Sequence, residues 1–282
     1  MSKKMLPLFF VFIGCLASGI YLILHRDSPA PPSNYRNQLA NPEVLNFFNA
    51  KAASPAGFKL LAYFNAESFK KLKNNEPIKE WTSLGLHPIT LEVISSATHP
   101  VYKKGSTNER PVVYFNGETY FEAPEVLGTD LIDANNTSLL IVFKPDAEDN
   151  PKDLTELFSW GDCDQRRFFA HLGKSMINFH YGRPTDRVDS TSVKIRTDRF
   201  NVLGLERRNN SSIIKFNGFK VGEVSNEANL DLYMTGPLIV GSSACQHRFK
   251  GAISEFMVYK NLTADEENGL LKRISEDYKL IF

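Results

Sequence analysis

The chain has 282 residues, of which 42% are hydrophobic and 21 are phenylalanine, enough to build a large core. Its 33 lysine and arginine residues nearly balance 32 aspartate and glutamate residues, which gives a formal net charge of +1. This balance lacks the basic patch or stripe typical of nucleic-acid-binding proteins, so we expect no nucleic-acid partner.

The first segment of the chain has the features of a membrane signal. Lys3 and Lys4 precede an uncharged apolar stretch at 5–24, which as a helix would span about 30 Å, the thickness of the hydrocarbon core. We expect residues 1–26 to form a signal anchor that holds the remainder outside the cytoplasm, in the periplasm or at the cell surface. Two alternatives stay open: a cleaved signal peptide that releases a secreted protein, and lipid attachment at Cys15.

A linker is expected at residues 27–57. Its first part, at 27–34, is polar and rich in proline, which keeps the chain extended. Asn41 followed by Pro42 is typical of a helix start, and the sequence predicts a short helix at 44–53.

Residues 58–282 are predicted to form an all-β, antiparallel jelly-roll β-sandwich closed by a helix. Short apolar runs separated by turn residues indicate roughly ten strands without long helices between them. The nearly continuous apolar run at 138–143 is typical of a strand buried on both faces. Three turn pairs predict hairpins, namely Asn116-Gly117, Gly173-Lys174 and Asn217-Gly218. Thr263 and Glu266 form a capping-box pattern at the start of the final helix.

From about residue 60 onward, the chain resembles the concanavalin A-like lectin and glucanase superfamily, in its bacterial laminin G-like jelly-roll branch. The matching pieces follow one another in the expected order and are turns and core strands: LAYFNA at 61–66, IKEW at 78–81, HPVY at 99–102, RPVVYFNG at 110–117, TSLLIVFKP at 137–145, LFSWG at 157–161, KFNG at 215–218, LIVGSS at 238–243, FKGAISEFMVY at 249–259 and LTADEE at 262–267. The resemblance implies a fold that more often binds than catalyses, with carbohydrate or an extracellular protein as partner.

Two other functions stay open on the same fold. A glycoside hydrolase would need two carboxylates close in space, and glucanases that resemble this fold alternate them on one strand. Glu255 is the single acid in its predicted strand, so we interpret it as a structural residue and assign no catalytic residue. The third possibility is a purely structural or adhesion domain. Trp81 and Trp160 are either core residues or sugar-stacking platforms.

Cys163 and Cys245 each lie in a predicted loop before a strand. Outside the cytoplasm two cysteines in one domain tend to pair, so we predict a disulfide between them, with two buried thiols as the alternative. A disulfide would bring two polar loops together. We predict a ligand-binding rim formed by Asp162, Asp164, Gln165, Arg166, His247 and Arg248.

Two metal possibilities arise. Laminin G-like domains often hold one calcium ion at the rim, and Asp162 and Asp164 are the local candidates for it, although Arg166 and Arg167 follow at once. His171 and His180 could approach each other across the Gly173-Lys174 hairpin. The sequence offers them no evident third ligand, so we interpret the pair as structural. No other cofactor is indicated.

Overall fold

The computed structural model describes residues 59–280, apart from the segments 85–87, 95–97, 106–109, 124–135, 147–154, 162, 164–166, 174–175, 183–186, 191–192, 209–210 and 226–236. The predicted anchor at 1–26 and the predicted linker at 27–57 lie outside the described residues. Within the described part, no helix combines the length and the apolar character that crossing a membrane requires.

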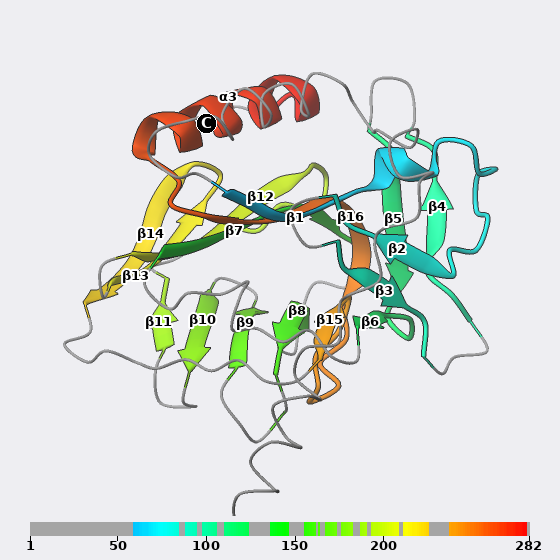
Figure 1. Ribbon diagram of the computed structural model, residues 1–282, viewed down its shortest axis with the longest axis horizontal. Coiled ribbons are helices and arrows are strands. Elements are labelled where there is room, and N and C mark those ends of the chain that lie inside the picture. The colour runs from blue at the N-terminus through cyan, green and yellow to red at the C-terminus, as the bar shows by residue number, and fades with distance from the viewer. Residues whose placement is uncertain are drawn as a thin grey trace, which may run out of the picture. The chain divides into compact units, whose positions relative to one another are not determined.

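The described residues form a sandwich of two antiparallel sheets with one helix over the outer face of the first (Figure 1). The all-β prediction is therefore confirmed. Sheet A consists, in spatial order, of β14 (Phe219–Ser225), β13 (Ser211–Phe216), β12 (Asn201–Arg208), β7 (Asn136–Pro145), β16 (Lys250–Lys260), β5 (Val112–Asn116) and β4 (Val101–Lys103), with β1 (Lys59–Asn65) also paired to β16. Sheet B consists of β11 (Arg187–Asp189), β10 (Ile177–Gly182), β9 (Arg167–Leu172), β8 (Thr155–Trp160), β15 (Leu238–Val240), β6 (Phe121–Ala123), β3 (Thr90–Glu92) and β2 (Glu80–Thr82). A short 3-10 helix, η2 (Ala66–Phe69), follows β1, and α3 (Ala264–Tyr278) follows β16.

The main core lies between the two sheets and is built by alternation along the strands. Successive side chains of a strand point to opposite faces, so every second residue of β10 faces inward. Both tryptophans belong to this core: Trp81 and Trp160 are 0% exposed, and Trp81 packs edge-on against Phe64. Neither ring can serve as a sugar platform, because no face of it is accessible.

A second core lies between sheet A and α3. In β7, Leu139, Ile141 and Phe143 face the main core while Leu140 and Val142 face the second one. The predicted burial of this strand on both faces is thus confirmed, because α3 covers the face that points away from sheet B. The helix contributes Leu270, Ile274 and Tyr278 to this contact.

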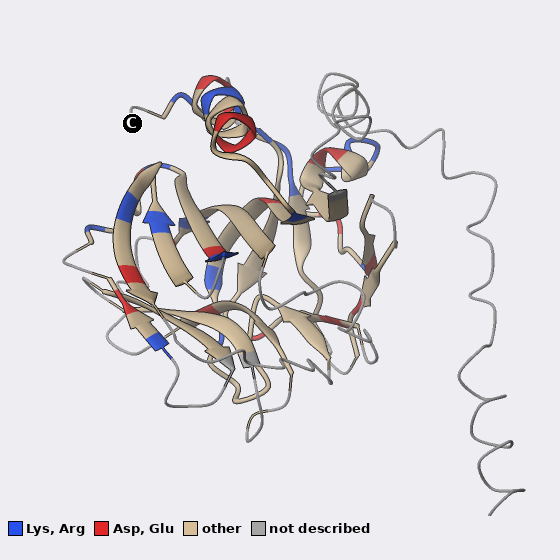
Figure 2. Cartoon of the chain, turned by 60° about the vertical axis from the view of Figure 1, so that its left-hand side comes forward, with Lys and Arg blue, Asp and Glu red and all other residues tan. Residues whose placement is uncertain are grey.

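The start of α3 follows the predicted capping box. The Thr263 hydroxyl accepts a hydrogen bond from the Glu266 backbone N–H, and the Glu266 carboxylate accepts one from the Thr263 N–H. The helix carries both acidic and basic residues (Figure 2). One of them, Glu267, lies 2.5 Å from Lys215 of β13, which also lies 2.9 Å from Glu206 of β12. These ion pairs fasten the helix to sheet A.

β16 pairs with three strands of sheet A. One of its edges pairs with β7, and its other edge pairs with β5 in the first half and with β1 in the second half. The register shifts between Ile253 and Glu255, so Ser254 is an extra residue in the strand. A bulge of this kind re-aims the following side chain, and here it directs Glu255 toward α3.

One of the three predicted hairpins is wrong. Asn217-Gly218 joins β13 and β14, with both residues at positive φ as the tight hairpin turn requires. The Gly173-Lys174 pair lies between β9 and β10, which pair with each other. The strands on either side of Asn116-Gly117 instead belong to different sheets, because β5 pairs with β16 and β6 pairs with β15. The Asn116 side chain accepts hydrogen bonds from the N–H groups of Glu118 and Thr119, which turns the chain across the sandwich.

Candidate functional site

The loop between β15 and β16, residues 241–249, is closed at its base. Gly241 has a φ of +88°, and a Cβ there would lie 2.3 Å from the ring of Phe115, so only glycine fits. The Phe249 N–H donates to the Gly241 carbonyl at 3.0 Å, and the Gln246 N–H donates to the Ser243 carbonyl at 2.9 Å. These contacts give the β15–β16 loop a defined course over the end of the sandwich.

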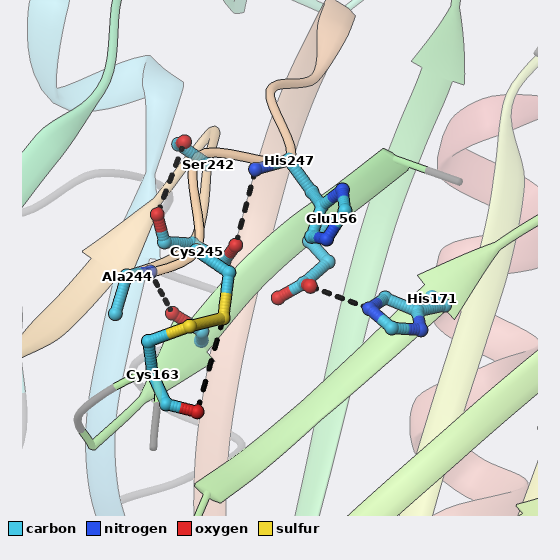
Figure 3. The surroundings of a disulfide bond; sticks show 9 residues. Glu156, Cys163, His171, Ser242, Ala244, Cys245 and His247 are labelled. Carbon is cyan, nitrogen blue, oxygen red and sulfur yellow. Dashed lines mark hydrogen bonds and ion pairs between the residues drawn. A yellow bond between two sulfur atoms is a disulfide. The ribbon is translucent and has the colours of Figure 1, made fainter. Parts of the chain in front are cut away.

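The predicted disulfide between Cys163 and Cys245 is confirmed, with their Cα atoms 5.1 Å apart (Figure 3). It joins the β15–β16 loop to the segment between β8 and β9. A hydrogen bond beside the disulfide also fixes the loop, because the Ala244 N–H donates to the Ser159 hydroxyl of β8 at 3.1 Å. The β15–β16 loop is therefore held by the disulfide and by a hydrogen bond to Ser159 of β8.

The predicted ligand-binding rim is described only in part. Asp162, Asp164, Gln165 and Arg166 lie outside the described residues, and with them the candidate calcium ligands. His247 and Arg248 are described, and they point to different surroundings. Arg248 is exposed, donates to the Glu118 carbonyl at 2.9 Å and lies 6.0 Å from the centre of the Tyr120 ring. The rim stays a prediction.

His247 belongs to a cluster on the outer face of sheet B that we call the Glu–His cluster: Glu156 of β8, His171 of β9 and His247 of the β15–β16 loop (Figure 3). Each offers one ligand atom, and no two of these atoms lie more than 4.8 Å apart. The His171 Nε2 lies 2.5 Å from the Glu156 Oε1. The centres of the His171 and His247 rings are 5.3 Å apart.

The predicted neighbour of His171 also lies nearby. The ring centres of His171 and His180 are 5.5 Å apart, and His180 stacks on Phe169 at 4.4 Å. The approach of the two histidines across the hairpin is therefore confirmed. Sequence reasoning missed Glu156 and His247 as their companions. The register that pairs Glu156 with His171 across β8 and β9 was the signal needed to find the first of them.

Glu255 has the structural role expected from the sequence. Arg273 of α3 donates to both of its oxygens, at 3.2 and 2.8 Å, and the hydroxyls of Tyr63 and Tyr278 lie 3.0 and 2.7 Å from them. Burial alone would raise the pKa of the Glu255 carboxyl, but Arg273 and these hydrogen bonds lower it below its ordinary value. The Glu255 carboxylate is therefore ionised, and both of its oxygens already have hydrogen-bond partners.

The outer face of sheet A is hollowed next to β4 and β5, at what we call the basic groove, which has a volume of about 460 Å³. Four cationic side chains line it, with one tyrosine and one acid among the other lining residues: Lys103, Lys104, Arg110, Lys144, Tyr114 and Asp146. The Lys103 ammonium lies 3.3 Å from the centre of the Tyr114 ring. Burial lowers the pKa of Lys103, and the charge of Asp146 opposes that shift.

Hydrogen bonds and ion pairs fix the positions of several side chains that line the basic groove. The Tyr114 hydroxyl donates to Asp146 at 2.7 Å, and Arg110 forms ion pairs with Glu67, at 3.3 Å, and with Asp277 of α3. Sequence reasoning missed this groove because its residues come from different strands and loops. The outward positions of β4, β5 and β7 place Lys103, Tyr114 and Lys144 on one face.

No family model matches the chain, and no curated protein sequence matches it. Solved structures with a similar fold include domain 4 of AbnA, an extracellular arabinanase of Geobacillus stearothermophilus in complex with arabinotriose, at 18% identity and a TM-score of 0.54 over 76% of this chain and 98% of that chain. The sialidase of Trypanosoma rangeli in complex with sialic acid is 12% identical, with a TM-score of 0.53 over 78% of this chain and 33% of that chain.

The binding domain of botulinum neurotoxin serotype D is also similar, with 8% identity and a TM-score of 0.53 over 76% of this chain and 52% of that chain. At these identities the likeness establishes the fold, a β-sandwich of two antiparallel sheets, and leaves the function open.

Proposed function

We propose that the chain is a membrane-tethered binding module located outside the cytoplasm, of the concanavalin A-like and laminin G-like type, whose ligand is an acidic carbohydrate bound in the basic groove. The observation that carries this proposal is the groove itself. Four cationic side chains line a hollow of about 460 Å³, within the usual size range of small-ligand sites.

The chemistry of the basic groove favours a carboxylated or sulfated sugar over a neutral one. Arg110 pairs with Glu67 and Asp277, and three lysines against the single acid Asp146 make the rest of the lining positive. A lysine ammonium is a compact charge on a flexible stem that can follow an anionic group, and charge-assisted hydrogen bonds are the stronger ones. The hydroxyl of Thr197 in the groove wall can pair with a sugar hydroxyl.

The known structures support a carbohydrate as the ligand class. One domain of similar fold was solved with arabinotriose, and a sialidase of which the chain covers 33% was solved with sialic acid, a carboxylated sugar. The proposed location is supported by the Cys163–Cys245 disulfide, since such bonds persist in oxidising compartments. The apolar stretch at 5–24 supports the membrane tether.

The test is a glycan array on which uronic-acid, sialic-acid and sulfated glycans stand beside their neutral counterparts. We expect the full-length chain, purified in detergent, to bind acidic members and to lose binding as salt rises. The double variant Lys103→Met/Lys144→Met should weaken binding at least tenfold. The control Lys220→Met/Lys272→Met removes the same charge on β14 and α3 and should bind as the wild type does.

The same array separates the basic groove from the predicted rim. Arg166→Ala combined with Arg248→Ala should leave binding intact if the groove holds the ligand. Loss of binding in this variant, with retention in Lys103→Met/Lys144→Met, would place the ligand at the rim and overturn the groove assignment. Equal binding of acidic and neutral glycans would overturn the proposed ligand class.

A further inference from the structure

Glu156 is a buried carboxylate whose two oxygens have different surroundings. Its side chain is 0% exposed on β8, and its Oε1 lies 2.5 Å from the His171 Nε2. Its Oε2 is buried and has no hydrogen-bond partner among the described residues. A buried charged oxygen without a partner destabilises the folded state, so a cation bound next to Oε2 would stabilise it.

Two imidazoles converge on this carboxylate from separate elements. His171 comes from the neighbouring strand β9, and His247 comes from the β15–β16 loop that the disulfide fastens (Figure 3). Two histidine nitrogens and one carboxylate oxygen form a ligand set that suits zinc and related late first-row metals, whereas calcium prefers oxygen ligands throughout.

We infer that Glu156, His171 and His247 bind a divalent late first-row metal ion, for which Zn²⁺ is the probe. Metal bonds of about 2.0–2.1 Å in a tetrahedron place ligand atoms roughly 3.4 Å apart. The three ligand atoms here lie within 4.8 Å of one another, so small side-chain rotations suffice to bring them to bonding distance. Three protein ligands leave a fourth position for water or a ligand oxygen.

The bound metal compensates the Glu156 charge and ties the β15–β16 loop to β8 and β9. The loop is then held at Cys245 by the disulfide and at His247 by the metal. This inference is independent of the proposed glycan binding, because the Glu–His cluster lies on sheet B and the basic groove on sheet A.

The test uses full-length chain carrying Cys15→Ser, so that the free thiol cannot take up metal, with the disulfide kept oxidised. After dialysis against a chelator, Zn²⁺ is titrated by calorimetry and Co²⁺ by visible absorption. We expect one Zn²⁺ per chain and the intense visible bands of tetrahedral Co²⁺. His171→Ala, His247→Ala and the isosteric Glu156→Gln should each weaken Zn²⁺ binding at least tenfold, and His99→Ala, outside the cluster, should not.

Circular dichroism confirms that each variant is folded before titration, and Glu156→Gln keeps the test informative if a histidine variant unfolds. Ca²⁺ should not displace Co²⁺. Absence of Zn²⁺ binding at millimolar metal would overturn the inference, as would equal Zn²⁺ affinity in wild type and Glu156→Gln. Either result would mean that the Glu156–His171 hydrogen bond and the contact between the His171 and His247 rings account for the cluster without a metal.

Discussion

Two buried glutamates, Glu255 on sheet A and Glu156 on sheet B, differ in how completely their carboxylate oxygens are hydrogen-bonded. Glu255 on sheet A is 3% exposed and has both oxygens engaged by Arg273, Tyr63 and Tyr278. Glu156 on sheet B is 0% exposed, and of its two oxygens only one has a partner among the described residues. Burial alone therefore does not distinguish the role of an acid in this fold. The number of its carboxylate oxygens that have hydrogen-bond partners does.

The disulfide beside the Glu–His cluster should give the largest effect. The double variant Cys163→Ser/Cys245→Ser opens a loop with a sequence separation of 82, for which chain entropy predicts a loss of about 4.5 kcal/mol in the free energy of unfolding. Urea denaturation measures it, with Cys15→Ser as the control that leaves stability unchanged. A loss below about 1 kcal/mol would mean that the β15–β16 loop is fixed without the covalent bond.

On sheet A, Arg273→Met should lower the free energy of unfolding by roughly 3 kcal/mol, because it leaves the Glu255 charge buried without its cation. Lys272→Met, one residue earlier on the exposed side of α3, is the matched control and should change little. If both variants were equally stable, Glu255 would not depend on its ion pair, and the contrast with Glu156 would be lost.

The charge of Glu255 can be tested by pH. Its pKa is lower in the folded chain than in the unfolded one, where it is about 4.3, so its contribution is complete above that pH and is lost as pH falls through the folded value. We expect Glu255→Gln to be less stable than wild type by about 2 kcal/mol at pH 7, and the difference to narrow below pH 4. A difference that grew on acidification would contradict the assigned ionisation.

The smallest effect is expected for Glu156→Gln in metal-free protein. Glutamine has the same shape, can still bond to His171 and removes a buried charge that has a single described partner. Its free energy of unfolding should therefore lie within about 1 kcal/mol of wild type, or above it. Thermal and urea unfolding in the presence of chelator measure it. A loss above 2 kcal/mol would place Glu156 in the same structural class as Glu255.

The sequence was sufficient for features whose causes are local. The apolar run at 138–143, the Thr263–Glu266 capping box and the Asn217-Gly218 hairpin follow from side-chain periodicity and turn chemistry alone. The Asn116-Gly117 pair has the same chemistry, but the sheet that the next strand joins depends on partners far away in the chain. Turn residues determine a local path and not a strand partner.

The candidate sites were less predictable for a related reason. Cys163 and Cys245 could be paired because they are the two cysteines of one domain. Glu156 lies in β8 between Thr155 and Leu157, where an acid is expected to face solvent, and only the β8–β9 register places it beside His171. The basic groove draws its lysines from β4, β7 and adjoining loop positions, so no window of sequence contains it.

The place of β15 and β16 in the sandwich has a consequence for synthesis. The two strands are consecutive in the chain, yet each lies inside a different sheet: β15 between β8 and β6, and β16 between β7 on one side and β5 with β1 on the other. A nascent chain that ends before Leu238 therefore holds two divided sheets with open strand edges, which invite aggregation. Productive folding has to wait for β15 and β16 to emerge, so a chain stalled before Leu238 should depend on chaperones far more than one that contains both strands.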